Sequence, residues 1–160
     1  MTTTAPTRRT WIALAAAGSA ALLAGAFGFQ YLGGLLPCAM CIWQRWPHAV
    51  AIALGAIGMA IPSAIVAGLG ALSMLGNAGI ALYHTGVERD WWEGPTSCSG
   101  SGIADMNVAD LLNPDMGTGI VLCDEVAWEM LGLSMASWNG LGSLALAGLW
   151  IVAATRPRRA

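Results

Sequence analysis

Two cysteines separated by two residues are the part of this chain best suited to chemistry. Cys38 and Cys41 lie in the stretch Pro37-Cys38-Ala39-Met40-Cys41-Ile42-Trp43-Gln44-Arg45, between two long apolar runs. A CxxC pair can close as a disulfide or open to a thiolate, and cationic or helix-N-terminal surroundings favour the thiolate. A disulfide across so short a loop removes little chain entropy. The spacing therefore predicts redox chemistry at this pair rather than a structural staple.

Two further cysteines, Cys98 and Cys123, complete a set of four. Four cysteines allow three pairings. Because Cys38 and Cys41 are adjacent, we expect Cys98 to pair with Cys123. Cys98 lies among small residues where a partner's thiolate could approach it, and the two carboxylates that follow Cys123 disfavour a thiolate there. Two purely structural disulfides are the alternative interpretation.

Metal and haem fit this cysteine pattern poorly. A zinc site would be expected to show a second closely spaced cysteine pair, but Cys98 and Cys123 are far apart in sequence. Covalent haem needs a histidine directly after the second cysteine of a CxxC motif, and Ile42 stands there. We therefore predict a thiol site without a metal.

Three residues near the CxxC pair are candidate quinone-binding groups. Arg45 is the only charged residue between positions 10 and 87, and it follows Cys41 by one helical turn. A cation there would stabilise a thiolate or the anion of a reduced quinone. His84 could hydrogen-bond a quinone carbonyl or carry its proton, and Trp43 offers flat apolar surface. Each also has an interpretation as an anchor or cap at the membrane interface, which is the one we favour for His48.

Composition indicates an integral membrane protein. Hydrophobic residues make up 56 % of the chain and charged residues 10 %, and lysine is absent. A typical globular chain has about 25 % charged residues, which are needed to cover its surface in water. No basic patch exists that could meet phosphates, so nucleic acid is not an expected partner.

Apolar runs predict four membrane-spanning helices. The uncharged run 46–83 is too long for one crossing, and Ile61-Pro62-Ser63 near its middle predicts a hairpin between two spans. A cleaved signal peptide is the alternative for the first run, but that run continues past any signal core. We predict one all-α membrane domain, residues 1–160: a four-transmembrane-helix bundle with a long periplasmic loop between helices 3 and 4. The expected spans are 11–33, 45–61, 64–83 and 138–155, with the loop at 84–137 and a short interfacial helix at 103–112.

Charge placement predicts the orientation. Five of the seven arginines lie near the two ends of the chain, whereas every acidic residue lies between positions 88 and 129. The positive-inside rule then places both termini in the cytoplasm. All four cysteines would face the periplasm, which is an oxidising compartment.

Ordered motifs along the chain resemble those of the disulfide bond formation protein B (DsbB) family of bacterial membrane thiol oxidases. They are Pro-Cys-x-x-Cys-Ile-aromatic-x-Arg at 37–45, the His-Thr-Gly-Val-Glu and Trp-Trp-Glu-Gly-Pro-Thr-Ser-Cys stretches within 84–98, and Cys-Asp-Glu-Val-x-Trp to Leu-Gly-Leu-Ser-Met-x-x-Trp-Asn at 123–139. The resemblance implies a four-helix bundle in the bacterial inner membrane that binds ubiquinone or menaquinone. Several family members have Glu before the arginine, whereas this chain has Gln44.

The resemblance also implies a route for electrons. A reduced periplasmic thioredoxin-like oxidase of the DsbA type would attack Cys98 in the Cys98–Cys123 disulfide. The Cys123 thiolate would then attack Cys38, and the freed Cys41, assisted by Arg45, would pass electrons to the quinone, with His84 close to its ring. Two alternatives are a vitamin-K-epoxide-reductase-like enzyme and a non-catalytic membrane interaction protein with structural disulfides.

Overall fold

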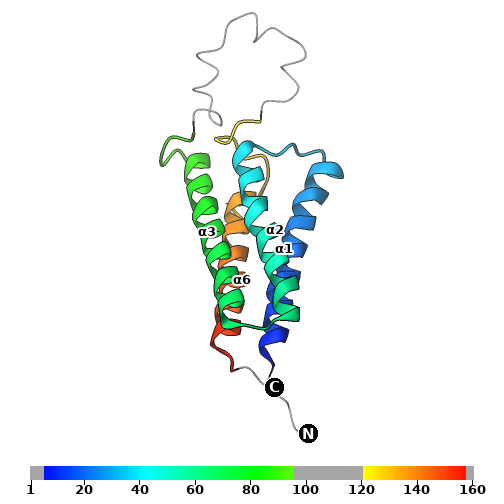
Figure 1. Ribbon diagram of the computed structural model, residues 1–160. Helices are drawn as coiled ribbons and strands as arrows, with labels where there is room; N and C mark the ends of the chain where they lie inside the picture. Colours follow the sequence, from blue (N-terminus) through cyan, green and yellow to red (C-terminus); the bar gives the residue numbers. More distant parts are fainter. Residues whose placement is uncertain (1–5, 96–120, 158–160) are drawn as a thin grey trace, which may run out of the picture.

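The described part of the chain is a bundle of helices that run alternately up and down. The computed structural model describes residues 6–95 and 121–157. These residues form α1 (Arg8–Tyr31), α2 (Ala39–Ala60), α3 (Ala64–Glu88) and α6 (Met135–Thr155), with short strands β1 (Glu129–Met130) and β2 (Leu133–Ser134) before α6 (Figure 1). Helices α1 and α3 each pack against both α2 and α6. The predicted all-α class with four helices is confirmed.

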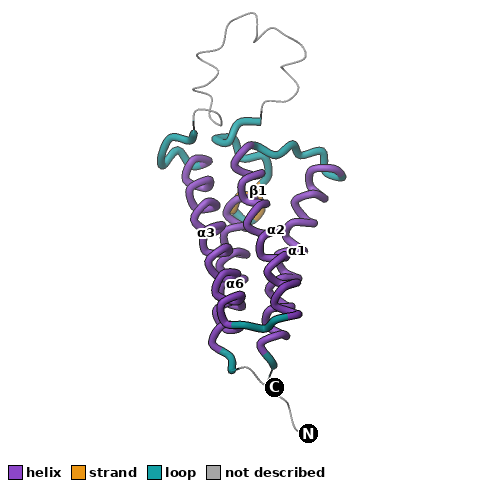
Figure 2. Tube along the Cα trace, in the orientation of Figure 1, coloured by secondary structure: helices purple, strands orange, loops and turns teal. Residues whose placement is uncertain are grey.

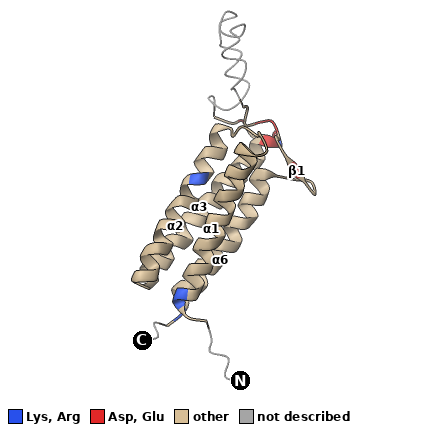
Figure 3. Cartoon of the chain, turned by 90° about the vertical axis from the view of Figure 1, so that its right-hand side faces the viewer, with Lys and Arg blue, Asp and Glu red and all other residues tan. Residues whose placement is uncertain are grey.

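Three of the helices within these residues, α1, α3 and α6, are long and apolar enough to cross a membrane. Helix α2 lies beside them and carries three polar residues in its first half, Gln44, Arg45 and His48, so its apolar part is shorter. Figure 3 shows a bundle body almost without charge, with acidic residues gathered at the end from which the β1–β2 hairpin projects.

Local sequence explains where the helices begin and end. Cys38, Ser63 and Ser134 are the N-caps of α2, α3 and α6, and each side chain accepts a hydrogen bond from the backbone N–H three residues on. The chain reverses between Ala60 and Ala64, where the sequence predicts a hairpin (Figure 2). The structure thus places Cys38 at a helix N-terminus and Cys41 in the first helical turn.

The structure adds detail at both ends of the predicted loop, whose bounds as a membrane-external segment stay a prediction. Helix α3 continues past Tyr83 to Glu88, so His84 is helical rather than the first residue of a loop. At the other end of the predicted loop, β1 and β2 form an antiparallel hairpin that leads directly into α6. The predicted interfacial helix at 103–112 lies outside the described residues.

Side chains in the bundle are sorted as expected for helices in lipid. Many large apolar residues point outward, such as Ile65 and Leu72 of α3. The buried face of the same helix is made mainly of small and polar residues, and repeats about every 3.5 residues: Ala67, Gly70, Ala71, Met74, Asn77, Ala78, Ala81 and His84. In lipid no hydrophobic effect drives helices together. Small residues are therefore favoured where helices meet, because they let the helices approach closely.

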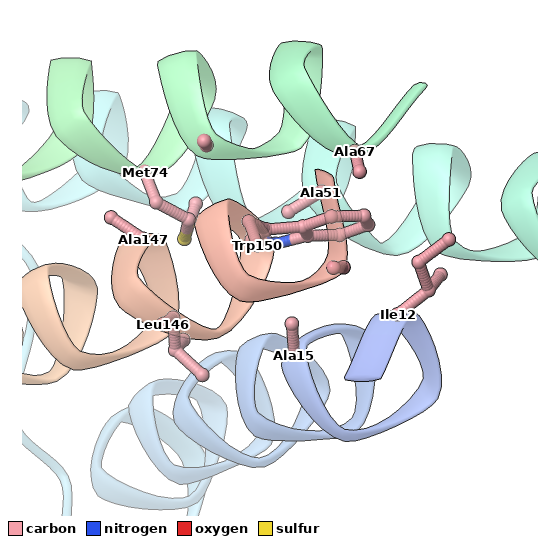
Figure 4. Close-up of a cluster of buried hydrophobic side chains, with 10 residues drawn as sticks. Ile12, Ala15, Ala51, Ala67, Met74, Leu146, Ala147 and Trp150 are labelled. Carbon is pink, nitrogen blue, oxygen red and sulfur yellow. The ribbon is translucent and has the colours of Figure 1, made fainter. Parts of the chain in front are cut away.

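The apolar core lies at the end of the bundle away from the cysteines. Trp150 of α6 is fully buried and lies among Ile12, Met74 and several alanines (Figure 4). Its indole fits because α3 has Gly70 opposite. A Cβ atom built on Gly70 would overlap Trp150 Cδ2 of the indole ring.

Gly70→Ala should therefore destabilise the bundle by about 1–3 kcal/mol, because the rigid indole has no free space to move into. The measurement is loss of helical circular dichroism during titration of the detergent-solubilised protein with SDS. Gly68→Ala is the matched control, since a Cβ there meets nothing within 4 Å. Equal midpoints for the two variants would contradict the proposed fit.

At the end of the bundle away from the cysteines, Arg8 of α1 contacts both α6 and the α2–α3 turn. Its guanidinium donates to the carbonyl oxygens of Ala153 at 3.0 Å and Pro62 at 3.1 Å, and also to those of Ala154 and Arg156. These carbonyls belong to the last turn of α6 and to the α2–α3 turn, where helix ends leave acceptors unpaired. One side chain of α1 thus satisfies the ends of its neighbours.

Candidate functional site

A cavity of about 260 Å³ opens beside the CxxC pair. Its walls are mostly apolar and come from α1, the start of α2, the end of α3, the segment that precedes β1 and the start of α6, with the carboxylates of Glu88 and Glu125 also on the lining. The polar side chains on the wall include Gln44, Arg45, His48, His84 and Asn139, with Cys38 and Cys41 at one side. An apolar pocket with a few convergent polar groups is the usual form of a small-molecule site.

The thiols of the CxxC pair are close together and differ in their surroundings. Cys38 and Cys41 are free, with Sγ atoms 3.0 Å apart. Cys38 is buried, and its sulfur also accepts from the Cys41 backbone N–H at 3.3 Å and lies 3.6 Å from His84 Nε2. Because several donors converge on Cys38, it is the sulfur suited to negative charge in the reduced pair.

Electrostatics agree with this assignment. The hydrogen bond from the Cys41 side chain, with help from His84, lowers the pKa of Cys38 to about 4, although burial opposes the shift. Because Cys41 keeps its proton in this hydrogen bond to Cys38, the pKa of Cys41 is raised above its ordinary value. The Arg45 guanidinium was expected to stabilise a Cys41 thiolate, but its contacts in the structure are with α1.

A lowered pKa means that the Cys38 thiolate is present above that pKa and is lost only as pH falls through it. With Cys98 and Cys123 replaced by alanine, so that the CxxC pair supplies the thiol signal, thiolate absorbance at 240 nm should therefore persist far below neutral pH. Cys41→Ala removes the donor, so the pH midpoint of this absorbance change should rise towards the ordinary thiol range. Cys41→Ser keeps an O–H donor, so its midpoint should stay lower than that of Cys41→Ala. Identical titrations of these two variants would contradict the role given to Cys41.

His84 is held by a hydrogen bond on each side of its ring. Its Nδ1 lies 2.8 Å from Gln44 Nε2, and its Nε2 faces Cys38 and lies 3.9 Å from Glu88 Oε1. Both His84 and Gln44 are buried. The predicted proximity of His84 to the CxxC pair is therefore seen in the structure, on the side of Cys38.

Arg45 is positioned by α1. Its Nη1 donates to Gln30 Oε1 at 2.6 Å, and its guanidinium carbon lies 4.8 Å from the centroid of the Phe27 ring. A guanidinium has five N–H donors in a plane. Further donors are therefore available to a ligand in the cavity that Arg45 lines.

Cys123 packs against the CxxC pair. It is fully buried and disulfide-bonded, while Cys98 lies outside the described residues. The sulfurs of Cys38 and Cys123 and a ring nitrogen of His84 all lie within 4.8 Å of one another. If the Cys123 disulfide were reduced, two thiolates and an imidazole at this spacing could serve a metal ion; the absence of a metal stays a prediction.

Trp43 does not join this group. Its side chain is 45 % exposed, and the described walls of the cavity do not include it. Its place on the outer face of α2 fits the anchoring interpretation better than the quinone-binding one.

The sequence reasoning missed a buried polar chain that extends from the cysteines into the bundle. Asn139 Nδ2 donates to Gln44 Oε1 at 2.7 Å, and Asn139 Oδ1 lies 2.9 Å from His48 Nε2. Asn77 Nδ2 then lies 3.1 Å from His48 Nε2 and donates to Ser143 Oγ at 2.8 Å. The sequence contained a signal for this chain of hydrogen bonds, because polar residues inside apolar spans usually pair with one another there.

The cavity residues fit a quinone head group by their chemistry. A quinone is a flat apolar ring with two carbonyl acceptors, and the cavity combines apolar walls with the N–H donors of Arg45. Small residues of α1, including Gly25 and Ala26, line the same cavity and leave room for a ring. The thiol pair lies on the cavity wall, where electrons could leave it.

Comparisons with known proteins cover almost the whole chain. A family model described as disulfide bond formation protein DsbB matches residues 8–153. The disulfide bond formation protein B of Methylococcus capsulatus is 37 % identical over 164 positions, covering 92 % of this chain and 97 % of the relative. That of Dechloromonas aromatica is 32 % identical over 146 positions, covering 83 % and 84 %. No solved structure matches significantly.

Proposed function

Because this chain belongs to the disulfide bond formation protein DsbB family, we propose that it is a membrane dithiol oxidase of the bacterial inner membrane. It reoxidises a periplasmic thioredoxin-like protein of the DsbA type and passes the electrons to ubiquinone or menaquinone. Both termini lie in the cytoplasm, and the cysteines face the periplasm. The quinone supplies a two-electron acceptor soluble in lipid.

One observation carries this proposal. The disulfide-bonded Cys123 has its sulfur within 4.8 Å of that of Cys38, and Cys38 and Cys41 both line the apolar cavity. This supports a relay of two thiol pairs. Cys98 receives the attack of the partner's thiolate, Cys123 is released and attacks Cys38, and Cys41 leaves as a thiolate facing the cavity.

The chain's own residues assist each end of the relay. Arg45, steadied by Gln30, directs positive charge into the cavity where electrons leave. Cys38 and Cys123 are both buried, so a protein partner enters the relay at Cys98 and reaches Cys38 only through Cys123. The reduction potential of a DsbA-type disulfide is about −120 mV, so only an acceptor of higher potential can reoxidise the reduced partner.

The test is anaerobic mixing of the purified protein with a reduced thioredoxin-fold dithiol protein and ubiquinone, followed by quinone absorbance. We expect quinone reduction that is stoichiometric with oxidation of the partner and is lost in Cys41→Ser. If the wild-type protein gives no quinone reduction with either ubiquinone or menaquinone, the oxidase proposal is wrong and the non-catalytic alternative is favoured.

A further inference from the structure

The amide of Gln44 has its orientation fixed by its neighbours. Its Nε2 lies 3.3 Å from the Met40 carbonyl oxygen, and its Oε1 lies 2.7 Å from Asn139 Nδ2. A carbonyl oxygen can only accept a hydrogen bond, so Gln44 must present its NH₂ group to Met40. The Asn139 amide then donates to the remaining oxygen, which completes both contacts.

This orientation determines where His84 carries its proton. The same NH₂ group of Gln44 lies 2.8 Å from His84 Nδ1, so Nδ1 must accept. A neutral imidazole has one donor and one acceptor nitrogen. The proton is therefore on Nε2, which lies 3.6 Å from the sulfur of Cys38.

We propose that Gln44 and Asn139 are positioning residues that hold His84 as its Nε2–H tautomer, so that this N–H stabilises the sulfurs of Cys38 and Cys123 while they exchange. The inference rests on the proposed function and gives His84 a role on the sulfur side of the relay. In the exchange, an electron pair of the Cys123 thiolate forms the Cys123–Cys38 bond. The Cys38–Cys41 bond breaks and its electron pair leaves on Cys41, so the step is neutral in electrons and in protons.

The groups around His84 define what its N–H can reach. The start of α2 presents Cys38 and Cys41, and the segment before β1 presents Cys123. On α3 itself the Glu88 carboxylate lies 3.9 Å from Nε2 and is a second acceptor for the same proton. Helix α6 acts through the uncharged Asn139.

The tautomer can be read directly by nitrogen-15 NMR of the oxidised protein labelled at histidine. We expect His84 Nε2 to give a protonated-type shift and Nδ1 an unprotonated-type shift. Gln44→Glu replaces the donor with an acceptor and should move the proton to Nδ1. Gln30→Glu is the matched control, because it makes the same change beside Arg45 and should leave the His84 shifts unaltered. A wild-type His84 protonated on Nδ1 alone would overturn the proposal, whatever the outcome of quinone assays.

A kinetic test separates positioning from mere folding. Quinone-free protein is mixed with a reduced thioredoxin-fold partner, quenched in acid, and the Cys38–Cys123 disulfide is quantified against time. In Gln44→Glu the proton should sit on Nδ1, so Nε2 can no longer donate to sulfur. At a fixed pH the exchange rate should therefore fall by about tenfold relative to wild type, the loss expected for one hydrogen bond to a charged group. A wild-type exchange rate in a Gln44→Glu protein whose His84 proton has moved to Nδ1 would refute the inference, while loss of quinone reduction alone would bear on the proposed function.

Discussion

Replacing Cys123 with serine should reduce oxidation of a thioredoxin-fold partner to background, a loss of about three orders of magnitude or more, as expected when a covalent nucleophile is removed. Cys38 is buried, and the structure gives it one disulfide-bonded neighbour, Cys123, within 4.8 Å. Without the Cys123 sulfur, a large protein partner has no route to the CxxC pair. The measurement is the steady-state rate of partner oxidation with ubiquinone in excess.

A small dithiol provides the internal control for this variant. Dithiothreitol can enter the cavity and reduce the Cys38–Cys41 disulfide without the second pair. Quinone reduction driven by dithiothreitol should therefore fall by less than about tenfold, since only the packing around Cys38 changes. If Cys123→Ser oxidised the partner as fast as wild type, the partner's thiolate would have to reach Cys38 directly, and the relay would be wrong.

Arg45→Leu should raise the KM for quinone by about ten- to a hundredfold, which corresponds to loss of a hydrogen bond from a charged group, about 1.5–3 kcal/mol. Arg45 lines the cavity and is held there by Gln30 and Phe27 of α1. Leucine fills a comparable volume without donors, so the variant tests the charge and hydrogen bonds rather than the space. The assay is quinone reduction at varied quinone concentration.

Two companion variants show which property of Arg45 is used. Arg45→Lys keeps the charge but loses the planar set of donors, so its KM should lie between those of wild type and Arg45→Leu. Gln30→Leu leaves the guanidinium in place but frees it from its 2.6 Å partner, and should raise KM less than Arg45→Leu does. An unchanged KM in Arg45→Leu would leave Arg45 with only the anchoring role.

Much of the bundle follows from local patterns in the sequence. The Ile61-Pro62-Ser63 reversal can be predicted because proline disfavours helix at the residue before it and serine caps the next helix. The approach of His84 to the CxxC pair follows from counting turns on the third helix. These features depend on residues close in sequence or on spans of fixed length.

Contacts between helices could not be predicted in the same way. The hydrogen bond between Arg45 and Gln30 depends on the rotation of α1 about its axis, which a nearly uniform apolar run does not specify. The Gln44–Asn139 contact joins α2 to α6 across the bundle. The β1–β2 hairpin was also missed, because its two strands have only two residues each and its turn places Leu131 at a φ of 56°, which is unusual for leucine.

The hydrogen bonds that Arg8 donates to the helix ends have a consequence for how the bundle assembles during synthesis. The acceptors at Ala153 and Ala154 belong to α6, which is synthesised well after Arg8 at the start of α1. Until α6 has been made, this cation lacks those two acceptors. A chain interrupted before α6 would therefore leave the guanidinium with the Pro62 carbonyl of the α2–α3 turn as its remaining partner among these helix ends.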